Sequence, residues 1–157
     1  MTWSTAPSLP SGRPASITPA TTLAAVLFAV IGFLLAIFAI AFVAAAGIAP
    51  AELAAHPVGE ALLRATPLIA AAAVVHFGVA AGLLLGAPAS RPLAVVVAIL
   101  GAAVSVAEAI AILAGRDPMA AESLDPARAA QSGLQIVGLL AATYTVMVVL
   151  SLRAKAR

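Results

Sequence analysis

Hydrophobic residues fill four long segments of the chain, and polar residues gather between them. The segments run from about 22 to 48, 67 to 85, 93 to 113 and 134 to 152. About 20 helical residues, each rising about 1.5 Å, cross a hydrocarbon core about 30 Å thick, so each segment can cross it once. Within the segments, Glu108 is the only charged residue. We therefore predict an all-α, four-helix transmembrane bundle.

The composition strengthens this prediction and excludes several kinds of function. Of the 157 residues, 64% are hydrophobic and 9% are charged, whereas soluble domains carry about 25% charged residues. No basic cluster could follow a phosphate backbone, which argues against nucleic-acid binding. The absence of cysteine excludes disulfides, thiolate metal sites and cysteine nucleophiles. The lipid bilayer is the partner that the sequence predicts most directly.

The segments at the two ends of the chain are polar. Residues 1–21 are rich in Ser, Thr, Pro and Gly and predict a disordered tail, whereas residues 153–157 predict a short basic tail. The first apolar segment is much longer than the 7 to 15 residues typical of a signal peptide. We therefore interpret it as an uncleaved membrane anchor.

The charges outside the spans predict the orientation, because Lys and Arg are retained on the cytoplasmic side. With both termini in the cytoplasm, the inner segments carry five cations and no acid: Arg13, Arg91, Arg153, Lys155 and Arg157. The outer segments carry three cations and all the loop acids: Arg64, Arg116, Arg128, Glu52, Glu60, Asp117, Glu122 and Asp125. We predict up-down-up-down topology with both termini in the cytoplasm.

Helix-start signals lie in both outer connections. Pro50 predicts a short helical turn, and Asp125 before Pro126 predicts a capped helix that leads into the fourth span.

Glycines recur inside the predicted spans. Gly78, Gly82 and Gly86 follow one another every four residues in and after the second span. Such spacing favours close contact with another helix, either within the subunit or in a homodimer. The seams of small residues predicted in the other three spans include one glycine each: Gly32, Gly101 and Gly138.

A few polar residues inside the spans are candidates for a site. A charge near the bilayer centre costs about 2.5 to 3.5 kcal/mol, so Glu108 should be paired, protonated or in contact with water. His76 and Tyr144 lie at matching depth, with Glu108 about 5 Å nearer the outside at the helical rise. Four further residues could complete a polar network: Ser105, Gln135, Thr143 and Thr145. The network could bind a proton or a ligand, or it could only fix the helix register.

The sequence contains no recognisable catalytic motif. It has no phosphate-binding loop, no nucleophile elbow and no set of His and carboxylates with metal-ligand spacing. His56 is poorly placed to join His76 in binding haem. We expect no enzyme activity, metal or cofactor.

The stretch from His76 to Ala94 carries one family resemblance. A glycine-rich span end leads through Gly86, Pro88 and Ser90 to Arg91. This stretch resembles the turn between the second and third helices of small uncharacterised four-helix bacterial membrane proteins. The resemblance implies a bacterial cytoplasmic membrane and no particular activity.

Two hypotheses about function follow from these features. The first is a non-enzymatic membrane protein that acts through helix contacts, as an accessory or assembly subunit or as a homo-oligomer. The alternative is a small transporter or channel subunit in which Glu108 and His76 bind a proton or a ligand.

Overall fold

The structure, a computed structural model, describes residues 17–117, 121 and 123–153. These residues form helices and connections without a strand. Residues 1–16 of the predicted disordered tail and 154–157 of the predicted basic tail lie outside the described residues. The helices are α1 (Pro19–Ile48), α2 (Pro50–Ala55), α3 (Pro57–Leu84), α4 (Ser90–Leu113) and α6 (Pro126–Arg153).

The helices begin and end at residues suited to those positions. The Thr18 side chain caps α1 by accepting a hydrogen bond from the Thr21 amide at 3.2 Å. At the start of α6, Asp125 Oδ1 accepts from the Arg128 amide at 3.1 Å, which confirms the predicted cap. Gly86 and Gly115 follow α3 and α4 with φ of 69° and 67°, a backbone region that glycine adopts without strain.

Four of these helices contain the predicted hydrophobic segments, and each is long and apolar enough to cross a membrane. Two extend well beyond those segments, because their outer turns are polar but remain helical. In α3 the helix continues from Pro57 through Pro67, and Arg64 pairs with Glu60 one turn away. In α6 the helix starts at Pro126, eight residues before the predicted span. The short helix α2 lies where Pro50 predicted a helical turn.

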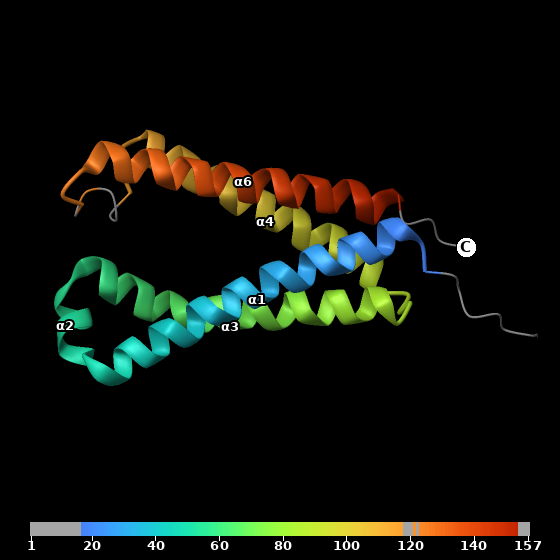
Figure 1. The fold of residues 1–157 in the computed structure, drawn as a ribbon, viewed down its shortest axis with the longest axis horizontal. Coiled ribbons are helices and arrows are strands. Elements are labelled where there is room, and N and C mark those ends of the chain that lie inside the picture. Colours follow the sequence, from blue (N-terminus) through green and yellow to red (C-terminus); the bar gives the residue numbers. More distant parts are fainter. Residues whose placement is uncertain (1–16, 118–120, 122, 154–157) are drawn as a thin grey trace, which may run out of the picture.

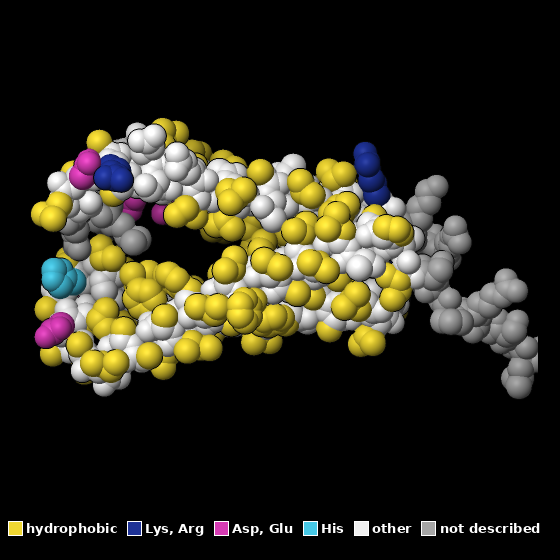
Figure 2. All heavy atoms as spheres, viewed as in Figure 1, with side chains coloured by type: hydrophobic (Ala, Val, Ile, Leu, Met, Phe, Trp, Pro, Cys, Tyr) yellow, Lys and Arg dark blue, Asp and Glu magenta, His cyan; other side chains and the backbone are white. Residues whose placement is uncertain are grey.

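The long helices form two pairs, α1 with α3 and α4 with α6 (Figure 1). The pairs meet at the end of the molecule where α1 begins and α6 ends. Toward the opposite end, which carries α2, they diverge. Figure 2 shows an open cleft between the diverging pairs, bordered largely by hydrophobic side chains. The bundle is therefore closed at one end only.

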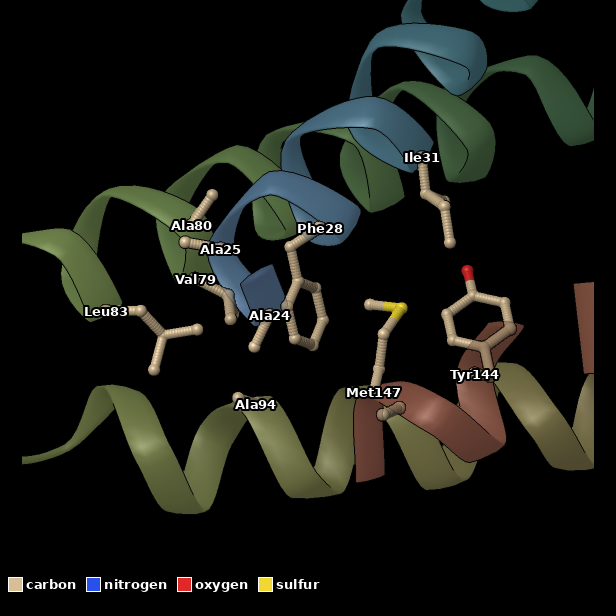
Figure 3. Close-up of a cluster of buried hydrophobic side chains, with 11 residues drawn as sticks. Ala24, Ala25, Phe28, Ile31, Val79, Ala80, Leu83, Ala94, Tyr144 and Met147 are labelled. Atoms are coloured by element: carbon tan, nitrogen blue, oxygen red, sulfur yellow. The ribbon is translucent and has the colours of Figure 1, made fainter. Parts of the chain in front are cut away.

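The main core lies where the two pairs meet. Its largest fully buried side chains are Phe28, Val79 and Met147, one from each of three helices. Figure 3 shows Met147 and Tyr144 of α6 extending toward Phe28 and Ile31 of α1. Small residues of α4, including Ala94 and Ala98, complete the cluster.

Large apolar side chains cover the outside of the helices. Leu68 is 74% exposed and Leu139 is 70% exposed, although both lie within long apolar segments. Water would make such a surface unfavourable, whereas hydrocarbon would not. The surface is therefore suited to a bilayer.

Candidate functional site

His76 lies at the centre of the molecule, where α3 meets α1 and α6. Its side chain is buried, and both ring nitrogens have hydrogen-bond partners: Nδ1 lies 2.7 Å from the Ala72 carbonyl oxygen and Nε2 lies 3.0 Å from the Tyr144 hydroxyl. A carbonyl oxygen can only accept, so Nδ1 donates. In the neutral ring, Nε2 therefore accepts the hydrogen of the Tyr144 hydroxyl. This arrangement satisfies both polar side chains without a charge.

Close helix packing holds His76 in place. The centroid of its ring lies 5.7 Å from that of Phe28. A Cβ atom at Gly32 would lie 3.1 Å from the His76 Cβ and 3.3 Å from the Ala73 carbonyl oxygen. Gly32 therefore allows α1 to approach α3 closely enough to cover the imidazole.

Tyr144 reaches His76 because a glycine makes room for its ring. A Cβ atom at Gly101 of α4 would overlap the Tyr144 ring. The side chain rises from α6 across the face of α4, and its hydroxyl is directed toward the α1–α3 pair (Figure 3). The contact links α6, α4 and α3 at one level.

Glu108 lies away from this buried pair. It is exposed, and it forms no hydrogen bond or ion pair with any described residue. The sequence suggests a Glu108–His76 pair, but in the structure the Tyr144 hydroxyl is the partner of His76 Nε2. Glu108 lies seven residues beyond Gly101, about 10 Å farther along α4 and only about 20° away around the helix. At that level the α1–α3 pair has diverged, so the carboxyl group faces the cleft.

The remaining polar candidates do not join His76. Ser105 is buried but donates to the Gly101 carbonyl oxygen of its own helix at 2.9 Å. Gln135 is exposed on α6. The neighbouring Thr143 and Thr145 also donate within α6, to the carbonyl oxygens of Leu139 and Ala141. The predicted network thus divides into a buried His76–Tyr144 pair and separate groups that are exposed or bond only within their own helix.

The glycines expected at helix interfaces have three different environments. Gly32, Gly82 and Gly101 lie against a neighbouring helix; at Gly82 an added Cβ would lie 2.9 Å from Ser90 Cβ. Gly86 lies in the turn after α3 with positive φ. An added Cβ would meet nothing within 4 Å at the two others, Gly78 and Gly138. Those two face outward and are available to another molecule.

Two shallow cavities lie at the end of the molecule that carries α2. One, of about 540 Å³, lies where α1, α2 and α3 meet and includes Glu52 and His56 in its lining. The other, of about 280 Å³, lies between the end of α4 and the start of α6 and includes Asp117. Among the described residues, no three His, Asp or Glu side chains come together as a metal site would require.

No family model, curated protein or solved structure matches the chain. The geometry of its own residues therefore carries the functional argument.

Sequence reasoning placed His76 and Tyr144 at the same depth but missed Phe28. One signal was present, because Phe28 lies one turn from Gly32 on the seam of small residues in the first span. A large ring among small residues fills the gap that those residues leave.

Proposed function

We propose that the chain is a multi-pass protein of the bacterial cytoplasmic membrane with both termini in the cytoplasm. Four apolar helices support the membrane assignment. The up-down-up-down orientation is supported by Arg91, Arg153, Lys155 and Arg157 on the proposed inner side and by the concentration of loop acids on the other side.

Within the membrane, we propose that the protein acts through helix contacts, without catalysis, as an accessory or assembly subunit or as a homo-oligomer. The observation that carries the proposal is Glu108, which is exposed inside an apolar span and has no partner among the described residues. An isolated carboxyl group at this depth is costly, so a contact that satisfies it stabilises association. The outward-facing Gln135, Gly78 and Gly138 provide further surface for such contacts.

The alternative is a small transporter or channel subunit that uses Glu108 and His76 together. The geometry favours it less, because His76 already has partners at both ring nitrogens and Glu108 lies on a different part of the molecule. A transport cycle would require the His76–Tyr144 hydrogen bond to break.

The test is the mass of the protein in its native lipid. Extraction into polymer-bounded lipid discs, followed by light scattering, should give particles that contain several copies or a stable partner. Proton uptake between about pH 5 and 8 should be unchanged in Glu108→Gln. Single copies without a partner, combined with proton uptake lost in Glu108→Gln, would favour the transporter instead.

A further inference from the structure

Glu108 and Gln135 lie at the same depth, although they face different directions. Two contacts fix the register of α4 against α6: Gly101 lies against the Tyr144 ring, and Ile112 Cδ1 would lie 3.2 Å from a Cβ at Gly133. The antiparallel register places Glu108 level with about residue 137. Gln135 is two residues away, a vertical difference of about 3 Å.

Gln135 cannot satisfy Glu108 of its own chain. It lies nine residues from Tyr144, which at about 100° per residue places the two on opposite faces of α6. Tyr144 faces the interior, so Gln135 faces outward, with Gly138 one turn away and open space beside it. Glu108 faces the cleft on the other side.

We propose that the cleft receives the N-terminal turns of α6 of a second copy of this chain, with Gln135 of that copy bonded to Glu108. This inference rests on the proposed function and specifies that the partner in the helix contact is a second copy of the chain. A neutral carboxyl group and a primary amide form two complementary hydrogen bonds, because each has one donor and one acceptor on the same side. The pair leaves no charge in the hydrocarbon and no donor or acceptor of the carboxyl group unused.

Several features favour a second copy as the occupant. Two copies inserted with the same orientation bring Glu108 and Gln135 to the same depth without any shift. Lipid chains could fill the apolar cleft (Figure 2) but offer no donor to the carboxyl group. No cation of the chain can do so from within a span, because every described Arg lies outside the four apolar segments. Gly138 lets the incoming helix approach closely.

The contact joins two surfaces that lie on opposite sides of the subunit, so both cannot meet across one two-fold axis and the contact is head-to-tail. Such contacts close into rings when the rotation between copies allows it. With all copies oriented alike in one membrane, the ring axis runs along the membrane normal. We expect a closed ring of three or more copies rather than a two-fold dimer.

Site-specific cross-linking tests this contact. Because the chain has no cysteine, only the introduced cysteines can form a disulfide. Two differently tagged chains, one with Glu108→Cys and the other with Gln135→Cys, are expressed together and oxidised in native membranes. We expect a disulfide-linked dimer that carries both tags. The matched control carries Ile110→Cys instead of Glu108→Cys. Ile110 is also exposed and lies at a similar depth, but on another face of α4. The control should therefore form much less of the cross-linked dimer.

Substitutions that keep the fold test the hydrogen bonds separately. Glu108→Gln preserves two complementary bonds and should retain the oligomer. Glu108→Leu and Gln135→Leu should each weaken association about threefold or more, which corresponds to about 0.6 kcal/mol for an average interhelical hydrogen bond. Equal cross-linking at residues 108 and 110, or an oligomer unaffected by both leucine variants, would overturn the proposed contact but leave the proposed function standing. A single-copy particle without a partner would overturn both.

Discussion

At the scale of single residues, the centre of the molecule depends on one hydrogen bond and two glycines. The His76–Tyr144 pair is buried and uncharged, and Gly32 and Gly101 make room for its two rings. The sequence predicted the matching depth of the two polar side chains and a polar network that contains both, but not that Glu108 would lie outside it. Depth follows from helical rise alone, whereas pairing depends on which faces the helices turn toward each other.

Tyr144→Phe should lower the free energy of unfolding by about 0.6 kcal/mol, with an upper range of about 2 kcal/mol, because it removes this interhelical hydrogen bond. The measurement is reversible unfolding in mixed micelles. Thr145→Val is the control, since its hydroxyl bonds only within α6 and should matter little. Equal effects of the two variants would contradict the assigned role of Tyr144.

Gly101→Ala should destabilise the protein by about 1 to 3 kcal/mol, the usual cost of overpacking a core. The added methyl group would overlap the Tyr144 ring, and this ring cannot move without breaking the hydrogen bond between its hydroxyl and His76. Gly138→Ala, with open space around it, should be neutral for unfolding of the single chain. The same unfolding titration compares the two, and a neutral Gly101→Ala would show that α4 and α6 pack differently.

At the scale of helices, the sequence predicted four spans and the structure contains four apolar helices that include them. Charge and hydropathy located the spans but not the ends of α3 and α6, because polar residues can continue a helix after it leaves the apolar segment. The glycine series shows a second limit. Regular spacing suggested one interface, but Gly78 faces outward, Gly82 packs against α4 and Gly86 forms a turn.

Gly86→Ala should therefore cost about 1 to 2 kcal/mol of stability, because an alanine with φ near 69° is strained. Gly78→Ala changes the same residue type in α3 at a position with normal φ and open space. We expect Gly78→Ala to alter the free energy of unfolding by less than about 0.5 kcal/mol. Unfolding of the two variants in parallel checks the difference, and similar losses would argue for one shared glycine interface.

At the scale of the whole molecule, the unexpected feature is the division into two helix pairs. The predicted four-helix bundle did not include this division, because nothing in the hydrophobic pattern distinguishes a face packed on another helix from a face exposed to lipid. Both are apolar in a membrane protein. The pairs diverge toward the end that carries α2 (Figures 1 and 2), and Glu108 is exposed there rather than buried in a core.

The proposed topology has four membrane crossings with the α3–α4 turn in the cytoplasm. Single cysteines replace exposed Glu52, Ala89 or Leu124 in the cysteine-free chain, and an impermeant maleimide is applied to spheroplasts. We predict labelling at residues 52 and 124 in intact spheroplasts, and at residue 89 only after lysis. Labelling of 89 from outside, or of 52 and 124 from opposite sides, would contradict the account.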